Sequence, residues 1–231
     1  MTRRVARWSK RIDELVAYVA TGSGPGLQSE LGRWLQESPR FASFVEANRD
    51  KIRKKLLNAD GAEGRLDVRA ELRLAHRLLA DRRFDVAFEA YGAHQRGPDL
   101  SVIYRANQRF NLEVTRLHGA IDVPRLAGLI AAKVRQLPAE APNALVISGR
   151  ELGVTEALLG DAARQLKARA DARDDAFFAR HGAGDARSFY AHYLRLSGVF
   201  VFDEDDAGVV FWANREARRP LSDEIVSRLR T

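Results

Sequence analysis

The clearest hydrophobic pattern in the chain lies in residues 97–119, where apolar side chains recur at every second position on both sides of a polar turn at 105–109. The alternation predicts a β-hairpin, whose apolar positions are Leu100, Val102 and Tyr104, then Phe110, Leu112 and Val114. Because strand side chains change face at each residue, Glu113 and Thr115 share the face opposite to Val114. Such a hairpin would bring Asp99, at the start of the first strand, close to Glu113.

Apolar residues at helical spacing predict that residues 2–58 fold as helices. The helical pattern is interrupted at Thr21–Gly26 and resumes as a short helix around Leu27–Gln36. Another helix begins at Ser38-Pro39 and includes Leu56. Polar residues and glycines favour a boundary at Asn58–Gly64. We therefore predict a helical N-terminal region over residues 1–62 and an α/β core over residues 63–231.

A helix predicted over Asp67–Asp81 carries a charged residue on its apolar side. At about 100° per residue, Glu71 falls among the apolar positions of this helix, which are Val68, Leu72, Ala75, Leu78 and Leu79. A carboxylate in that position is costly unless it is paired or bound to a metal. Glu71 therefore either forms a buried salt bridge with an arginine or points at the same site as Asp99 and Glu113.

The remaining pattern predicts a mixed central sheet flanked by helices, an α/β fold. Its further elements are a strand at Phe84–Ala90, a helix from Asp122 to Leu137, a buried strand at Asn143–Ser148, a helix at Val154–Ala170, an interrupted helix over Phe177–Leu196, and a C-terminal hairpin of Gly198–Phe202 and Val209–Ala213 around the acidic turn Asp203–Asp206. Lys133 lies roughly 60° from the apolar stripe of its helix, near enough to reach over a sheet edge.

Two convergent carboxylates with room for water suit a hard cation such as Mg²⁺. Pro98-Asp99, thirteen intervening residues, and then Glu113-Val114-Thr115 resemble the motif of the PD-(D/E)xK nuclease superfamily, which has a restriction-endonuclease-like fold. The similarity extends upstream to Glu71 and downstream through Asn143–Ile147. One position departs from the family pattern, because Thr115 stands where the family usually has a lysine.

The resemblance implies a metal site. Asp99, Glu113 and the carbonyl of Val114 would hold Mg²⁺ or Mn²⁺, and Glu71 would bind metal through water or fill a second site. Lys133 is similar to helix lysines that replace the missing strand lysine in several nuclease-like families, although an ordinary exposed lysine explains it equally well. Thr115 can hydrogen-bond a water but supplies no charge.

Arginines next to these residues are candidates for phosphate contacts. Arg105, Arg109 and Arg116 flank the predicted site, and bidentate bonds from them would position nucleic acid without reading its sequence. Two basic clusters in the helical region, one at residues 3–11 and one at residues 49–55, are further candidates, with solvated helix faces as the competing explanation.

The charge and composition of the chain limit the kinds of partner and site that we expect. The formal net charge of +7 and the pI of about 10.0 favour polyanions, although abundant arginine and alanine also fit a biased base composition. The complete lack of cysteine excludes a disulfide framework, a thiolate zinc site and a cysteine nucleophile. The five histidines show no pair at metal-ligand spacing. With no signal-like start or long apolar run, we expect a soluble cytoplasmic protein without a membrane partner.

These observations lead to three hypotheses. The first is a nuclease that hydrolyses phosphodiester bonds of DNA or RNA with a divalent metal. The second is a catalytically inactive, nuclease-like module that binds nucleic acid. The third is an interaction or structural protein whose carboxylates only pair with arginines. A homodimer is compatible with each of them, since the sequence does not fix the oligomeric state.

Overall fold

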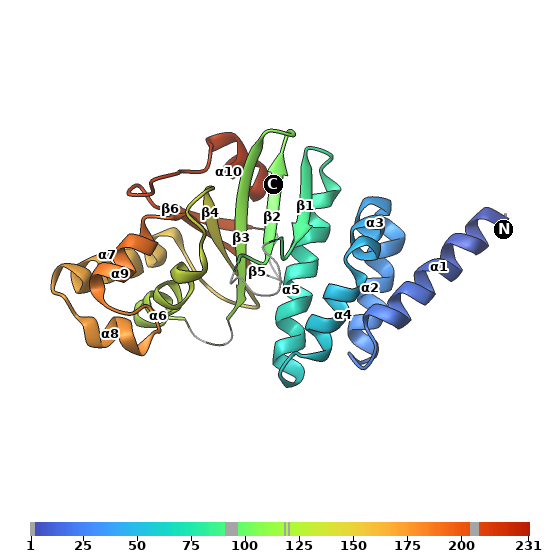
Figure 1. Cartoon of the computed structure of the whole chain (residues 1–231), viewed down its shortest axis with the longest axis horizontal. Coiled ribbons are helices and arrows are strands. Elements are labelled where there is room, and N and C mark those ends of the chain that lie inside the picture. Colours follow the sequence, from blue (N-terminus) through green and yellow to red (C-terminus); the bar gives the residue numbers. More distant parts are fainter. Residues whose placement is uncertain (1–2, 91–96, 118, 120, 204–207) are drawn as a thin grey trace. The chain divides into compact units, whose positions relative to one another are not determined.

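The predicted α/β architecture, a mixed sheet flanked by helices with a helical N-terminal region, is present in the computed structural model (Figure 1). The structure describes residues 3–90, 97–117, 119, 121–203 and 208–231, with the backbone alone for residues 3–7. The chain divides into two units, residues 1–88 and residues 89–231. Among the described residues, no helix combines the length and the apolar character needed to cross a membrane.

The first unit is helical and ends in a short strand. Its elements are α1 (Arg3–Val19), α2 (Pro25–Glu37), α3 (Pro39–Ala47), α4 (Arg49–Leu57), α5 (Gly61–Ala80) and β1 (Phe84–Phe88). The corner between α5 and β1 is held by Arg40, whose guanidinium donates to the carbonyls of Leu79, Asp81 and Phe84 at 2.9, 2.9 and 2.5 Å.

Two helix boundaries differ from the prediction. The helix expected to run from Ser38-Pro39 through Leu56 is two helices, because Asn48 leaves helical geometry and its side-chain amide donates to the Phe44 carbonyl at 2.8 Å. Helix α5 begins at Gly61 rather than Asp67, so the expected boundary segment is partly helical. Gly64 permits this, because a Cβ there would lie 3.2 Å from the Ala59 carbonyl carbon.

The described part of the second unit contains five strands and the remaining helices. Its elements are β2 (Leu100–Tyr104), β3 (Gln108–Arg116), α6 (Val123–Lys133), η1 (Val134–Gln136), β4 (Asn143–Gly149), α7 (Glu156–Asp171), α8 (Asp175–Arg180), α9 (Ala186–Tyr193), β5 (Leu196–Asp203), β6 (Val209–Ala213) and α10 (Asp223–Arg230). The two predicted hairpins are confirmed. Residues 204–206 of the expected acidic turn lie outside the described part of the chain.

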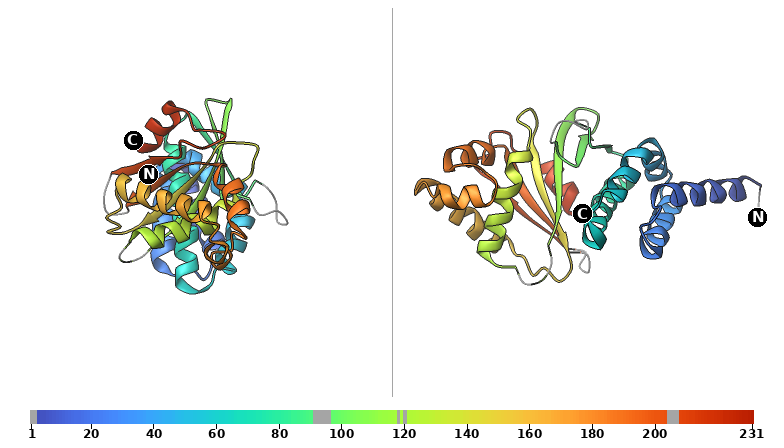
Figure 2. Two further views of the ribbon diagram at one scale, coloured as in Figure 1. Left: turned by 90° about the vertical axis from the view of Figure 1, so that its left-hand side faces the viewer. Right: turned by 60° about the horizontal axis from the view of Figure 1, so that its bottom comes forward.

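The strands of this unit are arranged in chain order, β2-β3-β4-β5-β6. The outer pairs, β2 with β3 and β5 with β6, are antiparallel, whereas β3, β4 and β5 run parallel to one another. Parallel neighbours require crossover connections, and α6 and α7–α9 provide them. Figures 1 and 2 show these helices gathered on one face of the sheet.

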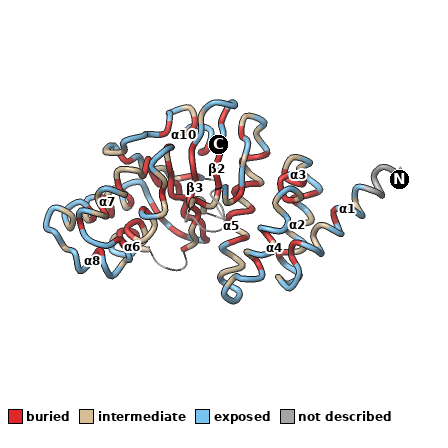
Figure 3. Tube along the Cα trace, in the orientation of Figure 1, coloured by how far each residue is buried: buried red, intermediate tan, exposed pale blue. Residues whose placement is uncertain are grey.

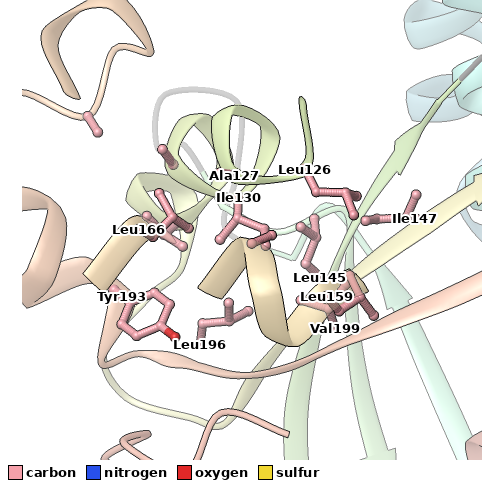
Figure 4. Close-up of a cluster of buried hydrophobic side chains, with 14 of the residues drawn as sticks. Leu126, Ala127, Ile130, Leu145, Ile147, Leu159, Leu166, Tyr193, Leu196 and Val199 are labelled. Atoms are coloured by element: carbon pink, nitrogen blue, oxygen red, sulfur yellow. The ribbon is translucent and has the colours of Figure 1, made fainter. Parts of the chain in front are cut away.

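The core of the second unit lies between that face and the crossover helices. Leu145 and Ile147 of β4 and Val199 of β5 pack there with Ile130 of α6 and Leu159 of α7, all at most 1% exposed (Figure 4). Every residue of β4 is buried, as a central parallel strand requires (Figure 3). Since Glu113 pairs with Leu145 in the parallel register, Glu113 faces the same core.

A row of buried polar side chains crosses the sheet on this same face. Ser101 Oγ donates to Asn111 Oδ1 at 2.8 Å, and Asn111 Nδ2 donates to Asn143 Oδ1 at 3.0 Å. The Asn143 N–H donates to Ser197 Oγ at 3.1 Å, which links β5 to the row. The four residues, which we call the polar row, are at most 3% exposed. Because burying such groups is tolerable only when they are hydrogen-bonded, the row favours one strand register.

The C-terminal helix α10 was not expected from the pattern, although Ser222 caps it and Ile225 is buried on its apolar side. Its Glu224 Oε1 accepts hydrogen bonds from the Tyr104 hydroxyl and from Arg105 Nη2, both at 2.8 Å. Arg105 and Ala106 have positive φ angles of 48° and 64°, a conformation that side chains other than glycine adopt rarely. The contacts with Glu224 thus hold the tip of the first hairpin in a strained turn.

Replacing Gly149 by alanine should destabilise the fold, because the added Cβ would lie 2.5 Å from the Leu117 carbonyl oxygen. We expect the free energy of unfolding in urea to fall by about 1–3 kcal/mol. Gly26→Ala is the matched control, since a Cβ at Gly26 has no neighbour within 4 Å. Equal stabilities of the two variants would contradict the close approach at Gly149.

Low pH should lower the stability of the first unit, because His76 is partly buried there. Its ring stacks on Trp34 at 5.6 Å and meets the edge of Phe41 at 5.1 Å, and this burial lowers the pKa of His76. The unfolded chain therefore takes up the proton first, so the free energy of unfolding should fall as pH drops below about 6.5. His76→Phe should reduce this pH dependence in urea melts between about pH 7 and 5. An unchanged dependence would show that His76 does not cause it.

Candidate functional site

The hairpin brings Asp99 next to the strand that carries Glu113. The pairing of β2 with β3 ends at Leu100 with Leu112, so Asp99 directly precedes the paired part of β2 and Glu113 directly follows the paired part of β3. The Asp99 carboxylate is held beside β3, because its Oδ2 accepts the Val114 N–H at 2.8 Å. Asp99 is thus bonded to the residue that follows Glu113.

Helix α6 contributes a cation to this place. Lys133 Nζ donates to Glu113 Oε1 at 2.9 Å, and the two side chains are 25% and 3% exposed. The local sequence explains how the lysine arrives there. Asp122 caps the helix by accepting the Arg125 N–H at 2.9 Å, and α6 then packs on the sheet through residues such as Ile130 until it ends at Lys133.

Electrostatics favour a cation beside Glu113. An almost fully buried carboxylate requires a partner of opposite charge. The Lys133 ammonium meets this requirement. Asp99 adds a second carboxylate, which accepts the N–H of the next residue along β3, Val114.

Three residues of β3 complete the surroundings. Thr115 lies on the same face as Glu113, one pair further along the sheet, where it is level with Ile147. Val114 points to the other face, level with Val146, and its N–H is bound to Asp99. Arg116 ends the strand and is partly exposed, on the face opposite to Glu113.

The other two predicted phosphate ligands lie at the far end of the hairpin. Arg105 belongs to the turn, pairs with Glu224 and lies over the Tyr104 ring at 5.4 Å. Arg109 is exposed at the start of β3, opposite Ile103. Glu113 lies four positions further along β3 than Arg109, which is about 13 Å along a strand. The hairpin therefore does not bring Arg105 and Arg109 beside the Glu113–Lys133 pair.

Glu71 has a local partner in the first unit. It is 4% exposed, as expected from its place on the apolar side of α5. Its Oε2 lies 2.7 Å from Lys55 Nζ of α4, so this carboxylate forms a buried ion pair with a lysine, a residue type that was not considered from the sequence. Asp99, Glu113 and Lys133 belong to the second unit, and a role for Glu71 in their site stays a prediction.

The donor set available to a metal is small. Over the described part of the chain, no group of three or more histidine, cysteine, aspartate or glutamate side chains is arranged to hold a metal ion. Asp99 and Glu113 provide oxygen donors, the kind that Mg²⁺ prefers. One or two carboxylates are a common protein contribution to a magnesium site, with water and substrate phosphate as the other ligands. The donors present therefore fit Mg²⁺ in kind and in number.

Sequence reasoning missed the residues that position the site. Asn111 precedes Glu113 by two residues on the same face of β3, and Ser101 follows Asp99 by two residues, so the polar row fixes the strand that carries Glu113 and the strand that Asp99 leads into. A signal for this was present, because Asn111 lies between Phe110 and Leu112, and Asn143 begins an otherwise mostly apolar strand. Their pairing depends on the parallel register between β3 and β4, which no local pattern reveals.

Breaking the Glu113–Lys133 pair should be costly. Lys133→Met leaves the Glu113 carboxylate buried without its ammonium, and we expect the free energy of unfolding to fall by about 3 kcal/mol. Glu113→Gln with Lys133→Met should recover part of this loss, giving a coupling energy of at least about 1 kcal/mol in a double-mutant cycle measured by urea unfolding. Lys167→Met is the control, because its pair with Glu216 is 51% and 33% exposed and should contribute less than about 1 kcal/mol. A coupling energy near zero would contradict the buried pair.

Comparison with known proteins assigns no family to the chain. No family model, no curated protein and no solved structure matches it. The resemblance to PD-(D/E)xK nucleases therefore stays a prediction from the sequence.

Proposed function

We propose that this protein hydrolyses phosphodiester bonds of nucleic acid with a divalent metal. The observation that carries the proposal is the Glu113–Lys133 pair: an ammonium held 2.9 Å from a buried carboxylate, with the carboxylate of Asp99 bonded to the N–H of the next residue, Val114. Two acids and one lysine are the residue types that a PD-(D/E)xK site requires. Glu113 also lies toward the carboxyl end of β3, the end at which open α/β sheets commonly bind ligands.

Lys133 supplies the charge that Thr115 lacks. Thr115 occupies the position of the family lysine on β3, and Lys133 comes from the helix that follows this strand and covers the same face. The ammonium has three N–H donors, one of which is used by Glu113 Oε1. In this proposal, Lys133 orients the attacking water or stabilises the charge that develops on the phosphate. The Thr115 hydroxyl provides an uncharged hydrogen bond to water.

Asp99 and Glu113 would hold the metal, with the Val114 carbonyl as a further oxygen ligand. Bound there, Mg²⁺ or Mn²⁺ would lower the pKa of a water and clamp the scissile phosphate. The hydrogen bond from the Val114 N–H fixes the orientation of the Asp99 carboxylate. Lys133 limits the negative charge on Glu113 until metal and substrate arrive, which keeps the buried carboxylate tolerable in the free protein.

The purified protein should cut plasmid DNA, single-stranded DNA or RNA when Mg²⁺ or Mn²⁺ is present, and chelator should stop the cutting. Glu113→Gln should lower the rate by at least about 100-fold, because it removes a negatively charged ligand. Lys133→Met should also lower the rate, whereas Lys167→Met should not, since Lys167 pairs with Glu216 at the exposed surface of α7. Cutting that survives Glu113→Gln would come from a contaminating nuclease.

A structural role for the same residues is the second candidate, and one observation favours it. Both carboxylates already have partners in the protein, Glu113 in Lys133 and Asp99 in the Val114 N–H. Calorimetric titration with Mn²⁺ separates the two functions. A site for catalysis should bind Mn²⁺ and lose this binding in Asp99→Asn, whereas a structural pair should bind none at millimolar metal.

A further inference from the structure

Positive charge is divided unequally between the two units. Residues 1–88 contain 18 lysines and arginines against 12 aspartates and glutamates, a formal charge of +6, whereas residues 89–231 contain 20 against 19, a charge of +1. The basic excess that points to a polyanionic partner therefore belongs almost entirely to the unit that lacks Asp99, Glu113 and Lys133.

Many basic side chains of the first unit are committed to contacts within it. Arg40 binds three carbonyls, Arg69 pairs with Glu30 at 2.5 Å, and Arg83 pairs with Asp81 at 2.7 Å. Lys55 pairs with the buried Glu71, and Arg11 pairs with Glu46. These residues hold helices and corners together, so the charge available to an outside partner must come from elsewhere in the unit.

Helix α4 presents that charge. Arg49, Lys51 and Lys54 are exposed and Arg53 is partly exposed, whereas Ile52 and Leu56 on the other side of the helix are buried. Lys51 Nζ donates to the Phe88 carbonyl at 3.2 Å, so we call the other three basic residues, Arg49, Arg53 and Lys54, the α4 basic face. Asp50 is the acidic residue among them. Within the described residues, neither Arg53 nor Lys54 has a carboxylate partner, and Arg49 approaches Asp50 only at 3.9 Å.

An aromatic ring from α1 orders the two arginines of this face. The Cζ atoms of Arg53 and Arg49 lie 4.4 and 5.6 Å from the centre of the Tyr18 ring, which is 39% exposed. The Tyr18 hydroxyl donates a hydrogen bond to the Asp50 carboxylate at 2.7 Å. This bond gives Asp50 a partner other than the arginines, and it fixes the position of the ring. A guanidinium that lies over a ring keeps its N–H donors at its edge, so less conformational freedom is lost when it binds phosphate.

We propose that the α4 basic face, with Tyr18, binds the phosphodiester backbone of nucleic acid. Planar guanidinium groups beside an exposed aromatic ring suit both parts of a nucleotide, since the arginines match phosphate and the ring can stack on a base. An anionic membrane would need an apolar surface to insert, and Leu57 is the one exposed large apolar residue among the described residues of α4. The first unit thus recruits the polyanion, independently of any chemistry at Glu113.

Binding is tested in chelator, so that cutting cannot occur, by fluorescence anisotropy with labelled single-stranded DNA, duplex DNA and RNA. In the full chain, Arg49→Gln with Arg53→Gln should weaken binding roughly tenfold at 0.1 M salt and lower the slope of log K against log salt by about 1–2 for duplex DNA. Lys54→Gln, at an exposed position of α4, should weaken binding as well, and it provides a test that does not depend on the folding of the double variant.

The matched control removes equal charge elsewhere in the same unit. Arg33→Gln with Arg82→Gln alters two exposed arginines away from α4 and should change the dissociation constant by less than about twofold. Equal losses in the control and in the α4 variants would overturn the proposal in favour of diffuse charge attraction. Unchanged binding in the α4 variants, or capture of the protein by phosphatidylserine vesicles but not by oligonucleotides, would overturn it as well. Since no cutting is measured, a failure of the proposed catalysis would leave this result unaffected.

Discussion

Strand register is the constraint on which the second unit depends, and the polar row enforces it. Ser101, Asn111, Asn143 and Ser197 come from four consecutive strands and satisfy one another in an environment with almost no access to water. A slip of one residue would turn each strand's side chains to the other face and leave several buried polar atoms unpaired. The same register sets the position of Glu113 on β3, which therefore follows from hydrogen bonds in which Glu113 itself takes no part.

The second organising element is a charge inside an apolar core. Glu113 shares its face of the sheet with Leu145 and Val199, and the helices that cover this face bring aliphatic side chains to nearly every neighbouring position. A carboxylate there costs stability, and Lys133 offsets that cost without a perfectly buried pair, since its own side chain is one-quarter exposed. For the function that we propose, this partial exposure would let substrate reach the ammonium.

The local pattern of apolar and polar residues was sufficient to predict much of this structure. The two hairpins, the buried strand β4, the cap of α6 at Asp122 and the burial of Glu71 follow from periodicity and capping rules that act over a few residues. The break at Asn48 could not be found in that way, because Ile52 and Leu56 continue an acceptable apolar stripe across it. The partner of Glu71 and the polar row depend on which elements become neighbours in space, and that information is spread over the whole chain.

The scarcity of lysine in the second unit has a practical consequence. Among residues 89–231 the sequence contains two lysines, Lys133 and Lys167, and each is ion-paired with a glutamate. Because Lys167 is 51% exposed and Lys133 is 25% exposed, an amine-directed acylating reagent should modify Lys167 first. Peptide mapping of the acylated protein would then show how slowly the Lys133 amine reacts. That rate reports on the Glu113–Lys133 pair without any substitution in the chain.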